Sequence, residues 1–238
     1  MKTAIVTGAT SGIGEATSRS LINAGYQVML AGRRVDRLEA LTQDLGQHAA
    51  FHVTDVTSRQ DMAALVEKTI QTFGEPDVLI NNAGVMPLSF FASRKVDEWE
   101  QMIDVNLKGT LYGIDAVLPY MLGKEDGHIV NVASIAGLQA GPAFGAYSAT
   151  KFGVRALSES LRQEVGNKNV RVSIISPGTV QTELFGTITD ENVLSVIGDG
   201  FDYEPMQPKV IADSILYTLD QPSSVCVSEI VVRPTGQA

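Results

Sequence analysis

The sequence has 238 residues, 44% of them hydrophobic and 19% charged, which suits one domain with a full core. Its net charge of −9 argues against nucleic acid or an anionic membrane as a partner, because both attract basic surfaces. The single cysteine, Cys226, excludes an internal disulfide; no signal-peptide pattern or membrane-spanning apolar run is present, which predicts a cytoplasmic protein.

Short apolar runs alternate with longer segments of helical periodicity along the chain. Most of the runs are continuous, which is typical of strands covered on both faces. The predicted strands are Thr3–Val6, Gln27–Ala31, Ala49–Val53, Val78–Ile80, His128–Val132, Arg171–Ile175 and Ser228–Val232. Helices are predicted over residues 13–24, 36–45, 58–73, 97–122, 146–165 and 208–220. This alternation predicts one α/β domain over residues 1–238, a Rossmann-type doubly wound parallel sheet of about seven strands with helices on both faces.

A glycine-rich loop joins the first predicted strand to the first predicted helix. Gly8 allows a tight turn, Gly12 allows the backbone to approach a pyrophosphate, and Gly14 allows helix and strand to pack closely. The free N–H groups at the helix N-terminus favour phosphate binding. We therefore expect a dinucleotide to contact Gly8, Thr10, Ser11, Gly12, Ile13 and Gly14. A plain strand-to-helix turn is the alternative.

The second predicted strand ends in Gly32-Arg33-Arg34. An NAD site would normally place an acid here for the ribose 2′-hydroxyl, whereas guanidinium groups suit a 2′-phosphate. The pattern therefore predicts NADP (NADPH) as the coenzyme, bound through Arg33 with help from Arg34 and Arg37. Arginines that are simply solvated at a helix start are the alternative.

Polar and small residues follow the next two strands. In Thr54-Asp55-Val56, the Asp55 carboxylate is predicted either to accept a hydrogen bond from the adenine amino group or to be the N-cap of the next helix. Asn82, Ala83 and Gly84 either contact the adenosine side of the coenzyme or have a purely structural role.

Tyr147 and Lys151 are four residues apart on a predicted helix, so their side chains share one face. A free tyrosine has a pKa of about 10, which has to be lowered for proton transfer near neutral pH. The Lys151 ammonium and an oxidised nicotinamide are expected to supply that shift. Ser134, after the strand His128–Val132, is expected to hold the substrate oxygen, and Asn106 to anchor a water near Lys151.

These motifs, in this order, resemble those of the classical short-chain dehydrogenase/reductase family, from Lys2 nearly to the C-terminus. The resemblance implies that Tyr147 is the general acid/base, Ser134 the partner of the substrate oxygen, and Lys151 the ribose ligand that tunes the tyrosine. It implies that Asn106 anchors a proton relay. It also implies a nicotinamide bordered by Pro177, Gly178, Val180 and Thr182, and a homotetramer or dimer built on the helices near 97–122 and 146–165. The ending Val231–Gln237 is similar to the serine and 3-hydroxy acid dehydrogenase branch.

The region 183–207 interrupts the strand–helix rhythm, and we expect a lid or a surface excursion. The chain has no Lys or Arg between Arg171 and Lys209. Region 183–207 instead carries Glu183, Asp190, Glu191, Asp199, Asp202 and Glu204. A substrate carboxylate would require cations or N–H donors, so the sequence favours a neutral carbonyl or secondary alcohol over a 3-hydroxy acid. Arg94 or Lys95 could still supply donors. The expected pocket residues are Met86, Ala136, Leu138, Phe144, Leu184 and Phe185.

Two further functions are open to the sequence. A non-catalytic NADP(H)-sensing protein would keep the glycine loop and could lack the tyrosine or lysine, yet both are present. A sugar-nucleotide epimerase would need a longer C-terminal domain. His48, His52 and His128 show no ligand pattern, so no metal site is predicted.

Overall fold

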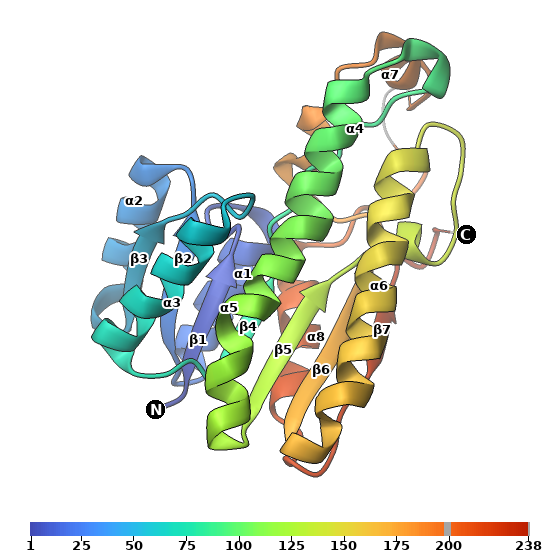
Figure 1. Ribbon diagram of the computed structural model, residues 1–238. Coiled ribbons are helices and arrows are strands. Elements are labelled where there is room, and N and C mark those ends of the chain that lie inside the picture. The colour runs from blue at the N-terminus through green and yellow to red at the C-terminus, as the bar shows by residue number, and fades with distance from the viewer. Residues whose placement is uncertain (198–200, 238) are drawn as a thin grey trace.

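Seven parallel strands form one sheet in the order β3-β2-β1-β4-β5-β6-β7, in a computed structural model that describes residues 1–197 and 201–237 (Figure 1). The predicted fold class is confirmed, and each predicted strand is present. The strands are β1 (Thr3–Thr7), β2 (Gln27–Gly32), β3 (Ala49–Val53), β4 (Val78–Asn81), β5 (Gly127–Val132), β6 (Val170–Pro177) and β7 (Glu229–Val232).

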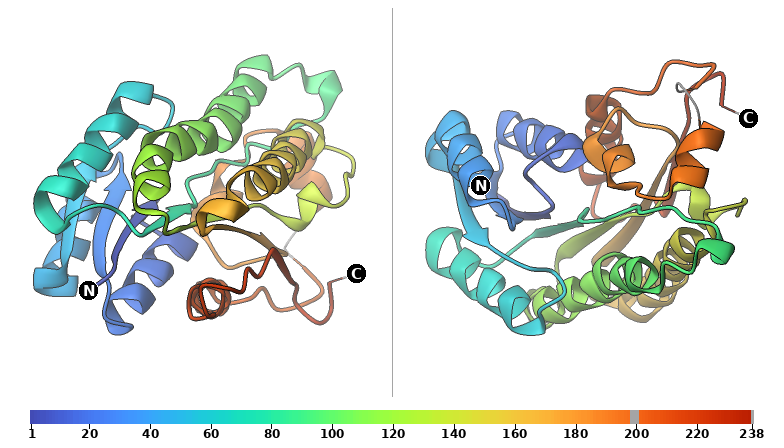
Figure 2. Two further views of the ribbon diagram at one scale, coloured as in Figure 1. Left: turned by 60° about the horizontal axis from the view of Figure 1, so that its bottom comes forward. Right: turned by 90° about the horizontal axis from the view of Figure 1, so that it is seen from above.

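Helices cover both faces of the sheet, which lies between two helical layers (Figure 2). Contacts place α1 and α8 side by side on one face and α3 and α5 side by side on the other. The helices are α1 (Gly12–Asn23), α2 (Val35–Leu45), α3 (Arg59–Phe73), α4 (Val96–Met102), α5 (Gly109–Lys124), α6 (Gly145–Val165), α7 (Glu191–Ile197) and α8 (Pro208–Leu219). None of the helices in the described ranges is long and apolar enough to cross a membrane.

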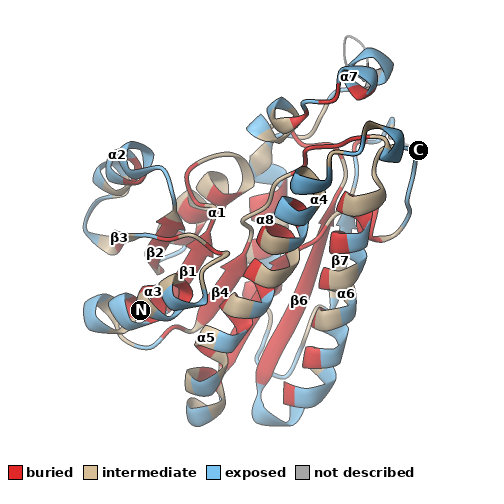
Figure 3. Cartoon of the chain, turned by 45° about the horizontal axis from the view of Figure 1, so that its top comes forward, coloured by how far each residue is buried: buried red, intermediate tan, exposed pale blue. Residues whose placement is uncertain are grey.

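The strands are buried on both faces because their side chains pack into two separate hydrophobic cores, one on each face of the sheet. On β1, Ala4 and Val6 join a cluster with side chains of α1, α2 and α8, whereas Ile5 joins a cluster with α3, α5 and α6. Figure 3 shows the buried strands beneath helices whose outer faces are exposed. Continuous apolar runs, rather than alternating ones, are what this arrangement requires.

The helix predicted over residues 97–122 is interrupted. It consists of α4, a π-helix over Ile103–Lys108, and α5. Asn106 lies in the π-helix, and its side chain bonds the backbone of Val85. A π-helical turn inside an α-helix widens the backbone locally and often marks a functional position.

The region 183–207 contains a 3₁₀ helix over Glu183–Thr187 and helix α7. Residues 198–200, and with them the predicted acid Asp199, lie outside the described residues. The segment starts and returns at one place, because Val180 pairs with Met206 and the Gln181 N–H donates to the Met206 carbonyl at 2.9 Å. These residues therefore form a base from which the segment projects toward α4 (Figure 1).

The strand order creates a crevice where the chain reverses direction across the sheet. β1 pairs with β2 on one side and with β4 on the other, so the loops after β1 and β4 turn to opposite faces. Open α/β sheets bind ligands outside the carboxyl ends of the strands at such a switch point. The site should therefore lie at this edge.

Candidate active site

A cavity of about 730 Å³ lies at the carboxyl edge of the sheet. It is lined by most of the residues that the sequence singled out for a coenzyme: Gly8, Thr10, Ser11, Gly12, Ile13, Arg33, Arg34, Asp55, Val56, Asn82, Ala83, Gly84, Tyr147, Lys151, Pro177, Gly178, Val180 and Thr182. Ser134 lines it as well, and so do the predicted pocket residues Met86, Ala136, Phe144, Leu184 and Phe185. The fold therefore gathers side chains from most of the chain around one space.

Four of the predicted site residues do not line this cavity, namely Gly14, Arg37, Asn106 and Leu138. For Leu138 the prediction was wrong. The chain leaves the cavity at Gly137, which packs so closely on α6 that a Cβ there would lie 2.8 Å from the Lys151 carbonyl oxygen. It returns with Gln139, Ala140 and Gly141. Gly14 and Asn106 lie just behind the lining.

Several lining residues were missed by the sequence reasoning. Phe201 and Tyr203 come from the returning arm of region 183–207, and Gln237 comes from the segment after β7. No motif marks these positions, because they reach the cavity only through the way the chain folds back. The resemblance of the ending Val231–Gln237 to one family branch was the only available signal.

The glycine loop has the conformation that its glycines permit. Gly8 and Gly12 have φ values of +64° and +54°, in the left-handed region that side chains disfavour. A Cβ on Gly14 would lie 2.2 Å from the Gly8 carbonyl oxygen, and one on Gly12 would lie 2.9 Å from the Thr182 Cγ2. Gly14 thus lets α1 pack on the loop, and Gly12 lets the base of region 183–207 approach it.

Hydroxyl groups of this loop hold an arginine rather than cap α1. Arg34 donates from Nε to the Thr10 hydroxyl at 3.0 Å and from Nη2 to the Ser11 hydroxyl at 2.7 Å. Ser11 is the N-cap of α1 but makes no capping hydrogen bond with its side chain. The first N–H groups of α1 therefore face the cavity without a side-chain partner, as phosphate binding requires.

Glu183 forms ion pairs with two of the arginines. Its carboxylate lies 2.7 Å from Arg34 Nη1 and 2.7 Å from Arg37 Nη1. The hydrogen bonds from Arg34 and then Arg37 hold the pKa of the Glu183 carboxyl below its usual value. Arg33 also lines the cavity, and its side chain makes no hydrogen bond or ion pair within the described part of the chain. Arg33 is the arginine best placed to accept an incoming anion.

The N-cap interpretation of Asp55 was wrong. The N-cap of α3 is Ser58, whose hydroxyl accepts a hydrogen bond from the Asp61 N–H at 3.1 Å. One Asp55 carboxylate oxygen accepts from the Thr57 N–H at 2.9 Å and from the Thr57 hydroxyl at 2.8 Å. Asp55 itself lines the cavity.

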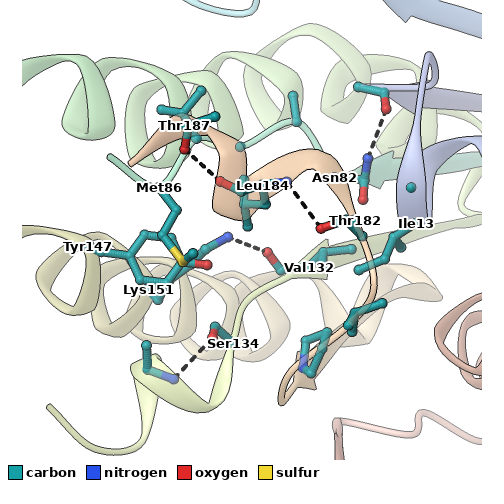
Figure 4. Close-up of a pocket in the computed structure, with 18 of the residues that line it drawn as sticks. Ile13, Asn82, Met86, Val132, Ser134, Tyr147, Lys151, Thr182, Leu184 and Thr187 are labelled. Atoms are coloured by element: carbon teal, nitrogen blue, oxygen red, sulfur yellow. Dashed lines mark hydrogen bonds between the residues drawn. The ribbon is translucent and has the colours of Figure 1, made fainter. Parts of the chain in front are cut away.

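Asn82 binds the backbone of the glycine loop. Its amide nitrogen donates to the Thr7 carbonyl at 2.9 Å and to the Gly8 carbonyl at 3.2 Å. This is the structural role that the sequence left open beside direct contact. It ties the end of β4 to the end of β1, across the switch point, and Figure 4 shows this amide at one side of the cavity.

Tyr147 and Lys151 lie one helical turn apart on α6 and are both buried, at 5% exposure each (Figure 4). The Lys151 Nζ is 5.7 Å from the centre of the Tyr147 ring and donates to the Val132 carbonyl at 2.9 Å. The Ser134 hydroxyl accepts from the Ala136 N–H at 3.1 Å. The three side chains come from the turn after β5 and from α6, and β5 contributes the Val132 carbonyl.

The acidity of Tyr147 shifts in the direction opposite to the prediction. Burial raises the pKa of the Tyr147 phenol to about 12, and a hydrogen bond with the Ser134 side chain only partly opposes this. Burial lowers the pKa of the Lys151 ammonium to about 8. In both groups the loss of hydration disfavours the charged form, because both lie away from water.

Asn106 is buried behind Tyr147 and Lys151. Its amide oxygen accepts from the Val85 N–H at 2.8 Å, and its amide nitrogen donates to the Val85 carbonyl at 2.9 Å. A Cβ on Gly84 would lie 3.3 Å from Asn106 Oδ1 and 3.9 Å from Lys151 Nζ. Asn106 and Lys151 therefore approach each other across Gly84. The water between them stays a prediction.

Sequence comparison agrees with this geometry. Residues 2–193 match the profile of the short chain dehydrogenase family. An uncharacterized oxidoreductase of Staphylococcus saprophyticus is 45% identical over 240 residues, which cover 100% of this chain and 97% of the relative. The chain belongs to the short-chain dehydrogenase family. An uncharacterized oxidoreductase of Listeria innocua is 44% identical, over 99% of this chain and 97% of its own length.

Solved structures of this family superpose closely on the chain. A serine dehydrogenase in its closed form, complexed with NADP+, has a TM-score of 0.91 and 31% identity, over 99% of this chain and 96% of that one. An alcohol dehydrogenase from the archaeon Thermococcus sibiricus, complexed with 5-hydroxy-NADP, has a TM-score of 0.89 and 30% identity, over 100% and 98% of the two chains. Both proteins hold a nicotinamide coenzyme or its derivative.

The end of the cavity beyond Tyr147 is apolar in this family member. Met86, Leu184 and Phe185 pack with Tyr147 and Phe144, whose rings meet edge-on with centroids 6.4 Å apart. Of the described residues that line the cavity, only Arg33, Arg34 and Lys151 are basic. Two of these belong to the opposite end, beside the glycine loop.

Proposed function

We propose that this protein is an NADP(H)-dependent oxidoreductase that transfers hydride between the nicotinamide and a neutral carbonyl or secondary alcohol. The observation that supports this most directly is that Tyr147, Lys151 and Ser134 line the same cavity as the glycine loop and Arg33. A proton donor for a carbonyl oxygen and a cradle for a dinucleotide thus share one space.

The residues present fit such a coenzyme. The glycines in the left-handed region, the uncapped N–H groups of α1 and Arg33 would hold the pyrophosphate and the 2′-phosphate. The Asp55 oxygen that Thr57 leaves free would accept from the adenine amino group. Pro177, Gly178, Val180 and Thr182 would border the nicotinamide, which supplies or takes the hydride when bound.

Tyr147 would give its proton to the substrate oxygen during reduction and take it back during oxidation, while the Ser134 hydroxyl holds that oxygen. Since burial keeps the phenol protonated, the resting side chain suits the role of proton donor. Reversal needs a more acidic phenol. The positive charge of an oxidised nicotinamide would act in that direction, together with the Lys151 ammonium.

The choice of a neutral substrate is supported by the charges around Tyr147. A substrate carboxylate in the apolar end would require a cation or several N–H donors. Arg94 and Lys95, the outside donors considered from the sequence, do not line the cavity, and Lys95 Nζ bonds the Thr189 hydroxyl at 2.5 Å. The lining side chains of region 183–207 are likewise not cationic.

The second candidate is an NADP-dependent 3-hydroxy acid dehydrogenase of the serine type, which is favoured by the similarity to serine dehydrogenase structures. Turnover of L-serine and 3-hydroxypropionate with NADP should be compared with that of neutral secondary alcohols such as 2-butanol and 1-phenylethanol. We expect a higher kcat/KM for the neutral alcohols. Preference for the acids would support the second candidate instead, and coenzyme binding without any turnover would support an NADP(H) sensor.

We also propose a homotetramer or dimer, for which the outer faces of the π-helix, α5 and α6 offer apolar side chains. Ile103, Leu111 and Phe152 are exposed, whereas Val117 and Val154 are buried in the cores of the subunit. Only the exposed set is available to another copy. Size-exclusion chromatography with light scattering would measure the mass in solution, and a monomer would contradict the assembly.

A further inference from the structure

The chain segment after β7 returns to the cavity. The Gly178 N–H donates to the Val232 carbonyl at 2.7 Å, so this segment begins beside the end of β6. The Gln237 N–H then donates to the Pro234 carbonyl at 2.9 Å. This turn brings the Gln237 side chain back to β6, where it lines the cavity next to Gly178 and Thr179.

Both polar atoms of the Gln237 amide form hydrogen bonds with one residue, Thr179. Its oxygen accepts from the Thr179 N–H at 2.9 Å, and its nitrogen donates to the Thr179 hydroxyl at 3.0 Å. The Tyr203 hydroxyl lies 2.9 Å from the same Thr179 oxygen. Three segments that are distant in the sequence therefore meet on a buried threonine in the cavity wall.

A Cβ at residue 178 could not be added without displacing the Gln237 amide, and a Cβ at residue 236 could not be added without moving Tyr203. A Cβ on Gly178 would lie 2.1 Å from the Gln237 amide oxygen, and a Cβ on Gly236 would lie 2.8 Å from the Tyr203 Cβ. Neither glycine has a positive φ, so space rather than backbone conformation calls for glycine here. The local sequence is thus matched to this docked position of the Gln237 side chain.

Thr179 also stands at the base of region 183–207. Its carbonyl accepts from the Met206 N–H at 3.0 Å, beside the bridge between Val180 and Met206. Fixing Thr179 therefore fixes both the end of β6 and the place where region 183–207 departs and returns.

We propose that Gln237 is a positioning residue that holds Thr179, and through it the wall of the cavity that would face the nicotinamide. This inference rests on the proposed function, because it takes the nicotinamide to lie on the Pro177–Val180 wall. Gln237 acts through Thr179 rather than on reacting atoms. A primary amide suits the task, since it offers one acceptor and one donor to the same partner residue.

The first test compares two ligands that share one end. NADPH has both the adenosine phosphates and the nicotinamide, whereas adenosine 2′,5′-bisphosphate has only the former. Gln237→Ala should weaken NADPH binding about tenfold, as loss of two neutral hydrogen bonds implies, and should reduce the rise in nicotinamide fluorescence on binding. Affinity for adenosine 2′,5′-bisphosphate, measured by calorimetry, should not change. Gln221→Ala is the matched control, because Gln221 bonds the Tyr217 carbonyl outside the cavity.

A second set of variants tests whether the two residues act together. Gln237→Glu keeps the acceptor for the Thr179 N–H but loses the donor, so its NADPH affinity should fall between those of the wild type and Gln237→Ala. Thr179→Val loses the hydroxyl at nearly constant volume. The double variant Gln237→Ala/Thr179→Val should bind NADPH more weakly than either single variant. Its fold-loss of NADPH affinity relative to the wild type should be smaller than the product of the two single fold-losses.

The outcomes separate this inference from the function beneath it. If the wild type binds neither ligand, the proposed function fails. If the wild type binds both and Gln237→Ala binds NADPH equally well, or weakens both ligands to the same extent, the positioning role is overturned and the function stands. Should Gln237→Ala not fold, Gln237→Glu carries the same comparison.

Discussion

The two ends of the cavity are built in opposite ways. The arginine end comprises Arg33, Arg34, Glu183 and the glycine loop 8–14, and its charged side chains are open to water; those of Arg34 and Glu183 are 42% and 55% exposed. The tyrosine end comprises Ser134, Tyr147 and Lys151, and the latter two are buried at 5% exposure each. One end is suited to selecting a ligand by charge, the other to moving a proton away from water.

This difference in burial determines how strongly a single side chain can affect binding or reaction at each end. Ion pairs between exposed groups are screened by water and salt, so each has a small effect on binding. In a buried site, a polar group interacts more strongly with whatever charge develops nearby, and replacing it has a larger effect. Substitutions at the two ends should therefore differ in magnitude and in their dependence on salt.

The largest effect is expected at the tyrosine end. Tyr147→Phe should lower kcat by about a thousandfold, because it removes the proton donor, while NADPH affinity stays close to that of the wild type. Steady-state kinetics and NADPH fluorescence titration measure the two quantities. Tyr217→Phe, on the exposed face of α8, is the control. Activity that survives in Tyr147→Phe would remove the proposed mechanism.

At the arginine end a smaller and selective effect is expected. Arg33→Ala should weaken NADPH binding about tenfold and leave NADH binding unchanged, because only NADPH carries the 2′-phosphate. Arg34→Ala should weaken both coenzymes, since Arg34 also holds the Thr10 and Ser11 hydroxyls of the glycine loop.

Calorimetric titrations at low and high salt would check the arginine predictions, with Arg59→Ala as the control outside the cavity. The loss of NADPH affinity with rising salt should be shallower in Arg33→Ala than in the wild type. An equal loss of NADH and NADPH binding in Arg33→Ala would show that this residue does not read the 2′-phosphate.

A separate effect, on stability rather than on binding or turnover, is expected at a buried group outside the cavity. Burial lowers the pKa of His128 to about 3 from an ordinary 6.5, and its Nε2 lies 2.8 Å from the Ser173 hydroxyl. Between these two pH values, His128 is protonated in the unfolded chain but neutral in the folded protein. Stability that is full above pH 6.5 is lost as the pH falls toward 3, by up to about 1.4 kcal/mol per pH unit.

His128→Asn should flatten this pH dependence of the free energy of unfolding, measured by urea denaturation between pH 6.5 and 4. His48→Asn, which replaces a half-buried histidine, should leave the slope as it is in the wild type. An unchanged slope in His128→Asn would mean that other groups cause the acid sensitivity.

The sequence predicted the fold and most of the cavity lining because both depend on local patterns. Continuous apolar runs mark the strands, and the carboxyl end of each strand leads to the next lining residue. The π-helix was not predicted, and the contact of Asn106 with Val85 was not predictable, because the two residues are distant in the sequence. Gln237 was missed for the same reason, and Leu138 was misplaced because the turn at Gly137 packs against α6.

The sign of the Tyr147 shift was also beyond the sequence. The spacing of Tyr147 and Lys151 on one helix face was predicted correctly, but spacing does not reveal how far each group lies from water. Asp55 shows the same limit on a smaller scale. Its position after β3 was clear, yet whether Asp55 or Ser58 begins α3 depended on the turn between them.

The part of the cavity wall formed by Gln237 has a consequence for biosynthesis. The ribosome makes the glycine loop first and residue 237 more than two hundred peptide bonds later. The residues of the glycine loop are thus present early in synthesis, but the wall beside β6 cannot be completed until synthesis has passed Gln237. Coenzyme captured during translation would be held by one side only.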